Sequence, residues 1–120
     1  SGCLLEAFPV HPCLISAASH AEREHPRESC GLVVKGTYWP CENIAKDPTA
    51  DFAIDPRVYL GAQMSGGVEA IVHSHPLDSP PSKLDISVCM RLGVTWYVYM
   101  GRTKKWLTID PCSGEIGSMG

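Results

Sequence analysis

A β-forming run at residues 68–73, followed closely by a proline-rich loop, constrains the fold of this chain more than any other feature. The run reads Val-Glu-Ala-Ile-Val-His, which is typical of a central strand. Pro76 has no backbone N–H and therefore ends strand pairing. We expect the core to form around this strand. The residues just before Pro76 should lie at its end, where α/β proteins commonly place their sites.

Helix and strand signals alternate along the rest of the chain. Asp55-Pro56 combines a helix N-cap with a proline at the first helical position. Lys35-Gly36-Thr37 is a hairpin turn signal. Helices are predicted for residues 12–24, 56 to about 64 and 82–92, and strands for residues 30–35, 37–45, 52–54, 68–73, 95–100 and 106–109.

This order of elements predicts an α/β (α+β) fold, in which helices flank a mixed, partly antiparallel sheet. The chain has 120 residues, which fits one domain, and we assign that domain to residues 3–112. Residues 1–2 are interpreted as a tag remnant. Residues 113–120, rich in glycine and serine, are predicted to be a flexible tail.

Composition excludes several classes of function. The formal net charge is −3, so the basic face typical of nucleic-acid binding is not expected. No apolar run approaches the ~18 residues of a membrane span, and the first residues lack the features of a signal peptide. The six cysteines include no Cys-x-x-Cys pair, so they are interpreted as reduced, partly buried thiols.

The histidines of the central strand suggest a metal site. His73 and His75 are two positions apart, so on a strand they point to the same face, about 6.5–7 Å from each other. Two imidazoles at this spacing can bind one zinc ion. Asp85, one helical turn after Ser82, is the candidate third ligand, which leaves a fourth position for water. Zinc lowers the pKa of such a water toward about 7 and so makes a nucleophile available.

A hydrolytic site also needs a base that is not a ligand. Glu28 is the candidate because it lies where the first helix gives way to the first strand. Ser82 is a candidate donor to the oxyanion. Simpler interpretations remain open: Ser82-x-x-Asp85 fits a helix capping box, the histidine pair fits a surface position, and Glu28 fits a solvated charge. The other histidines show no ligand spacing and are interpreted as surface residues: His11, His20 and His25.

Taken in order, these residues resemble the signature of the JAMM (MPN+) zinc metalloprotease family: a glutamate, then His-Ser-His-Pro, then Ser-x-x-Asp. Glu28 lies in Pro-Arg-Glu-Ser-Cys-Gly, and residues 73–76 match the second motif fully. The spacer of residues 76–81 is one residue shorter than is usual in that family. A narrower resemblance, to the JAMM domain of phage tail assembly proteins, rests on residues 39–45, 68–73 and 92–96.

The resemblance implies a JAMM/MPN-like (cytidine-deaminase-like) architecture and a Zn2+ cofactor. It implies that His73, His75 and Asp85 bind the metal, that Glu28 is the general base and that Ser82 assists catalysis. The implied function is a prokaryotic or phage metallopeptidase or isopeptidase. Its substrate would be a protein or peptide, such as a ubiquitin-like (β-grasp) protein or a phage tail component, in the bacterial cytosol or at the tail. The rival interpretation is a non-enzymatic structural component of phage tail assembly.

Overall fold

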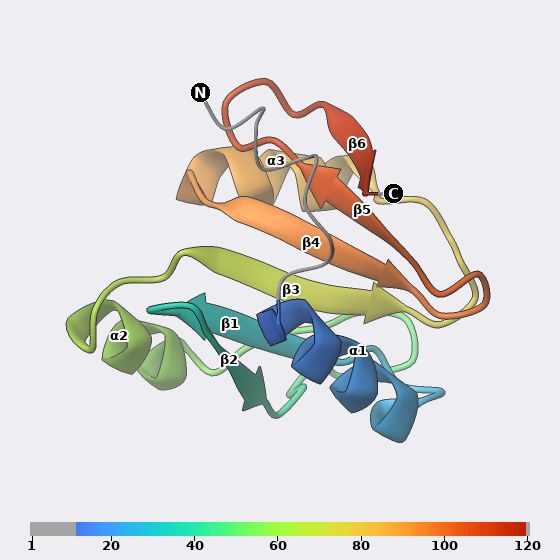
Figure 1. Ribbon diagram of the computed structural model, residues 1–120, viewed down its shortest axis with the longest axis horizontal. Helices are drawn as coiled ribbons and strands as arrows, with labels where there is room; N and C mark the ends of the chain where they lie inside the picture. The colour runs from blue at the N-terminus through green and yellow to red at the C-terminus, as the bar shows by residue number, and fades with distance from the viewer. Residues whose placement is uncertain (1–11, 120) are drawn as a thin grey trace.

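The computed structural model describes residues 12–119, and residues 1–2, His11 and the last residue of the expected tail lie outside the described part. Nine helices and strands follow one another along this part of the chain (Figure 1). They are α1 Pro12–Glu24, β1 Cys30–Val34, β2 Thr37–Cys41, α2 Pro56–Met64, β3 Ala70–His75, α3 Lys83–Leu92, β4 Thr95–Met100, β5 Lys105–Ile109 and β6 Ile116–Met119.

The strands form one mixed sheet in the order β2-β1-β3-β4-β5-β6. β3 and β4 are parallel, with α3 as their crossover, and the other neighbouring strands of the sheet are antiparallel. The expected α+β fold with a mixed, helix-flanked sheet is confirmed. β3 lies inside the sheet with a partner on each side, which is the central position expected from its sequence.

Two apolar clusters lie on opposite faces of the sheet. α1 covers one face, and α2 and α3 cover the other (Figure 1). Successive side chains of a strand point to opposite faces, so β3 serves both clusters. Ala70 and Val72 face α1, whereas Ile71 belongs to the cluster under α2 and α3. His73 and His75 share the parity of Ile71 and therefore lie on the α2/α3 face.

The helix signals of the sequence correspond to real caps. Asp55 accepts a hydrogen bond from the backbone N–H of Arg57 at the start of α2. Gly93 ends α3 in the left-handed conformation, with φ 71°, which glycine adopts without a Cβ penalty. None of the helices within residues 12–119 has the length and apolar character that crossing a membrane requires.

The expected flexible tail is instead a sixth strand over residues 116–119, paired with β5. A tight turn precedes it. The Asp110 carboxylate accepts hydrogen bonds from the backbone N–H groups of Cys112 and Ser113, and the Asp110 carbonyl accepts one from Gly114. Gly114 has φ 76°, which this turn requires. The prediction of a flexible tail is wrong here because the glycine and serine of this segment belong to a turn between two paired strands.

Three further expectations are wrong. β2 ends at Cys41, and residues 52–54 form no strand, so residues 42–55 contain neither helix nor strand. Hydrogen bonds from side chains hold this loop in place of a strand ladder. His20 is not a surface residue: its side chain is buried on the α1 face, and its Nδ1 lies 2.7 Å from the hydroxyl of Tyr38.

Candidate metal centre

The two histidines of β3 are held rigidly at the end of the strand. β3 pairs with both β1 and β4, and Cys30 and Val98 flank His73 in the register. Both histidine side chains are buried, and their ring centroids are 5.0 Å apart. The expected geometry, two imidazoles on one face directly before Pro76, is therefore present.

The protonation of both rings suits metal binding. Burial, reinforced by the neighbouring His75, holds the pKa of His73 well below its usual range, so this ring is neutral. Neither ring nitrogen of His73 has a hydrogen-bond partner among the described residues, which is costly for a buried polar group. His75 Nδ1 lies 2.6 Å from the carbonyl oxygen of Ser79. A carbonyl can only accept, so Nδ1 carries a proton and Nε2 is the nitrogen left for a metal ion.

Glu28 is brought to the histidines by the residues that follow it. Ser29 donates its backbone N–H to Ser74 Oγ at 2.8 Å, and Ser74 donates its backbone N–H to the Ser29 carbonyl at 3.1 Å. One atom each of Glu28, His73 and His75 that could bind a metal ion lies within 4.8 Å of the others. A carboxylate and two imidazoles are donors that zinc favours, so this set fits the ion that the sequence predicts.

The Glu28 carboxyl is strongly perturbed. Its side chain is 6% exposed, and burial, with the nearby Asp85 and Asp51 carboxylates, raises the pKa of Glu28 to about 8. Negative neighbours and a poorly solvating environment both favour the protonated acid. A carboxyl with such a pKa gains and loses a proton near neutral pH, which is what a general acid–base group needs.

Asp85 and Ser82 form the helix capping box and also lie beside the candidate metal site. The Ser82 hydroxyl accepts the backbone N–H of Asp85 at 3.0 Å, and the Asp85 carboxylate accepts the backbone N–H of Ser82 at 2.9 Å, so the capping box exists. Asp85 lies outside the mutual set of Glu28, His73 and His75. Its Oδ2 is nevertheless 3.6 Å from His75 Nε2, too far for a hydrogen bond but close to the ring nitrogen that does not face Ser79.

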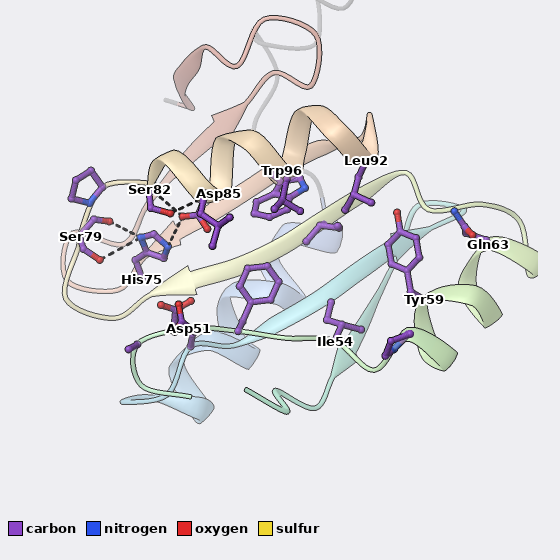
Figure 2. Close-up of a pocket in the computed structure, with 18 of the residues that line it drawn as sticks. Asp51, Ile54, Tyr59, Gln63, His75, Ser79, Ser82, Asp85, Leu92 and Trp96 are labelled. Atoms are coloured by element: carbon purple, nitrogen blue, oxygen red, sulfur yellow. Dashed lines mark hydrogen bonds and ion pairs between the residues drawn. The ribbon is translucent and has the colours of Figure 1, made fainter. Parts of the chain in front are cut away.

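A cavity of about 700 Å³ opens beside these residues, between the loop that precedes α2, α2 itself and α3. His75, Ser82 and Asp85 lie together at one end of it (Figure 2), Glu28 joins the lining close to His75, and the rest of the lining is mainly apolar. The polar groups thus lie at one end of a long groove. The apolar lining is formed mostly by Phe52, Ile54, Tyr59, Leu60, Ile71, Leu84, Val88, Leu92 and Trp96.

The remaining histidines of the described residues and the neighbouring Cys30 do not join this site. His20 belongs to the opposite face of the sheet, and His25 is exposed. Cys30 neighbours His73 in the sheet, but burial raises the pKa of its thiol to about 12. A thiol that stays protonated is a poor nucleophile.

Sequence reasoning missed the residues that support the site. Ser74 was only the spacer between two histidines, although its position on the opposite face could have suggested a structural bond. The Ser79 carbonyl gives no signal in sequence. Phe52 was expected in a strand, but its ring stacks on His73, with centroids 4.3 Å apart. Asn43 belongs to residues 39–45, which carry the resemblance to phage tail assembly proteins, but nothing in the sequence indicates a role for its side chain.

Comparison with known proteins identifies relatives of this chain. The family model described as prokaryotic homologs of the JAB domain matches residues 11–109. Tail tip assembly protein K of Escherichia phage N15 is 38% identical over 103 residues. This match covers 82% of the present chain and 42% of the phage protein, so the chain spans less than half of that relative's length.

Two solved structures share the fold. A protein of Desulfitobacterium hafniense, known from a solution structure, aligns with a TM-score of 0.60 and 22% identity, covering 88% of this chain and 84% of that chain. A JAB1/MPN domain protein from Archaeoglobus fulgidus aligns with a TM-score of 0.54 and 23% identity, covering 86% of this chain and 85% of that chain. At such identities the likeness concerns the fold alone.

Proposed function

Because the chain belongs to the prokaryotic homologues of the JAB domain, we propose that it is a zinc-dependent peptidase or isopeptidase. One observation carries this proposal: Glu28, His73 and His75 converge within 4.8 Å, and the buried ring nitrogens of His73 have no partner among the described residues. A metal ion would bind one of those two nitrogens, and its positive charge would favour the ionised form of the buried Glu28 carboxyl.

In the proposed site, His73, His75 and Asp85 would bind the ion. His75 presents Nε2 because the Ser79 carbonyl holds the proton on Nδ1. Asp85 reaches the site from the first turn of α3, where its capping bond to the backbone of Ser82 orients it. When bound, zinc supplies Lewis acidity that activates a water molecule and polarises a carbonyl group.

Glu28 and Ser82 carry the remaining chemistry. Glu28 accepts a proton from the attacking water and delivers it to the leaving amine. The Ser82 hydroxyl accepts its capping bond from the backbone of Asp85, so its own proton is free to stabilise the developing oxyanion. The groove then holds the substrate chain on one side of the cleaved bond.

The groove indicates the class of substrate. It runs from the candidate metal site along mainly apolar walls, and Leu60 and Leu84 on those walls are 55% and 68% exposed. An extended protein segment with apolar side chains would cover them. A phage tail component is the favoured source because the matched relative is named as a tail tip assembly protein, and a small β-grasp protein is the alternative.

The decisive experiment compares wild-type protein, Glu28→Gln and Asp85→Asn for zinc content and for hydrolysis of a blocked peptide library read by mass spectrometry. We expect wild type to bind about one zinc per chain and to cleave an internal amide. E28Q should keep the zinc and lose turnover, whereas D85N should lose zinc affinity.

Loss of zinc in E28Q together with retention in D85N would exchange the roles of the two carboxylates. A zinc-loaded wild type that cleaves no member of the library would contradict the peptidase proposal. In that case a structural role in tail assembly, suggested by the name of the phage relative, becomes the better proposal. His73→Ala would then be expected to lose zinc and keep binding to tail components.

A further inference from the structure

Asn43 makes an unusually complete set of side-chain hydrogen bonds outside the groups already assigned. Its Nδ2 donates to the carbonyls of Glu28 at 2.8 Å and Asp51 at 2.9 Å, and lies 3.4 Å from that of Pro48. Its Oδ1 accepts the backbone N–H groups of Ala45 at 3.0 Å and Ala53 at 3.1 Å. One carboxamide therefore connects the segment before β1 to both ends of the loop over residues 42–55.

The backbone of Glu28 is fixed by this loop from two sides. Its N–H donates to the Pro48 carbonyl at 2.7 Å, and its carbonyl accepts from Asn43. The same loop carries Phe52, which covers His73, and Asp51, whose charge acts on Glu28. Because the loop has no helix or strand of its own, the Asn43 side chain takes the place of a strand ladder in holding these groups together.

We propose that Asn43 is a positioning residue that fixes the Glu28 carboxylate against His73 and His75 through the backbone of the loop. The expected effect on catalysis rests on the proposed function, whereas the positioning of Glu28 does not depend on that function. A carboxamide is required because it offers donors and an acceptor on one short side chain. Aspartate has the same shape but would set a carboxylate against the carbonyls of Glu28 and Asp51.

The positioning is tested first without any reaction. Amide hydrogen exchange is measured by NMR on the full chain in chelator, for wild type, Asn43→Ala and Asn43→Asp. We expect exchange of the Glu28 amide to accelerate about tenfold or more in both variants, along with those of Ala45 and Ala53. Thr49→Ala is the matched control. Thr49 lies in the same loop, and its hydroxyl donates to the Asp47 carboxylate and not to the segment of Glu28, so the Glu28 amide should keep its wild-type exchange rate.

The second readout separates positioning from general weakening. On zinc-loaded protein, N43A and N43D should lower kcat by about 10- to 100-fold, because a displacement of about 1 Å costs that much, while KM changes less than about twofold. The zinc content should stay at the wild-type level, since Asn43 contacts none of the proposed ligands. T49A should match wild type in every one of these measurements.

Each possible result bears either on the positioning role of Asn43 or on the proposed function. Faster exchange at Ala45 and Ala53 with unchanged exchange at Glu28 would overturn the proposal, as would wild-type kcat in N43D. A wild type that hydrolyses nothing defeats the proposed function instead, and the exchange at Glu28 then decides the positioning role alone. If N43A fails to fold, the nearly isosteric N43D is compared with wild type in the same exchange and kinetic measurements.

Discussion

The ring of Phe52 stacks on the ring of His73, with centroids 4.3 Å apart and planes inclined by 22°. Trp96 meets the same imidazole edge-on, with centroids 5.2 Å apart. Two aromatic rings therefore hold His73 in one orientation and keep water from its sides. A metal ligand fixed in this way needs little reorganisation when an ion binds.

Removing that ring should weaken metal binding. Phe52→Ala exposes His73 to water and leaves its ring free to turn, so we expect zinc affinity to fall by about tenfold or more. The half-buried ring also contributes packing, and its loss should cost about 1–3 kcal/mol of unfolding free energy. Competition with a chelator of known affinity measures the first effect. Phe52→Leu, which retains apolar cover, should lie between wild type and F52A, and equal affinities in all three would contradict the role.

Ser82 should show two separable contributions. Ser82→Ala removes an N-cap and should cost about 1 kcal/mol, whereas Ser82→Gly should cost only a few tenths. Both lack the hydroxyl, so both should lower kcat by about 100-fold or more if Ser82 donates to the oxyanion. Chemical denaturation and steady-state kinetics on the same samples separate the two effects. Ser82→Thr keeps the hydroxyl, and a Thr variant as slow as S82G would rule the donor role out.

Much of the architecture was accessible from sequence because its signals are local. Proline at a first helical turn, the Asp55 cap and the Ser82 capping box fix their helices within a few residues. The groups around the histidines depend on contacts across long sequence separations. No local rule predicts that Phe52 lies in a loop and stacks on His73, or that Ser74 accepts a hydrogen bond from Ser29. These contacts exist only once the sheet has formed.

The buried Glu28 carboxyl should lower the unfolding free energy of the metal-free protein at high pH. In chelator, Glu28→Gln removes a buried carboxylate that stands near two others, so the variant should be more stable than wild type by about 1–3 kcal/mol at pH 9. The folded pKa of about 8 exceeds the usual value of 4.5, so the carboxyl favours folding below pH 4.5 and loses that contribution as the pH rises to about 8. The advantage of E28Q should therefore grow across this window. Exposed Glu42→Gln is the control and should show no such trend in denaturation curves.

His20 gives a pH dependence of the opposite sense. Burial is the main cause that lowers the pKa of His20 from its usual 6.5, so below that pH the unfolded chain takes up a proton more readily than the folded one. Unfolding free energy should fall as the pH drops from about 6.5, by at most about 1.4 kcal/mol per pH unit from this residue. His20→Gln should remove that part of the slope. The exposed His25→Gln should retain it, and identical slopes in wild type and H20Q would refute the assignment.

Leu84 tests the apolar groove. This side chain is 68% exposed yet lines the cavity, so Leu84→Asp should raise KM for a cleaved apolar peptide by about tenfold and leave kcat nearly unchanged. Met64 is 80% exposed on α2 and is not part of the cavity lining, which makes Met64→Asp the matched control. Equal KM values for the two variants would place the substrate elsewhere.

The paired hydrogen bonds between Ser29 and Ser74 have a consequence for how this sheet is specified. Residues 70–72 of β3 are apolar on both faces, so hydrophobicity does little to oppose a slip of one residue against β1. Such a slip would turn both histidines toward α1. The two serines distinguish the correct alignment from this alternative, because Ser74 Oγ meets the Ser29 amide in that alignment. The residue between the two histidines thus helps to set which way they face.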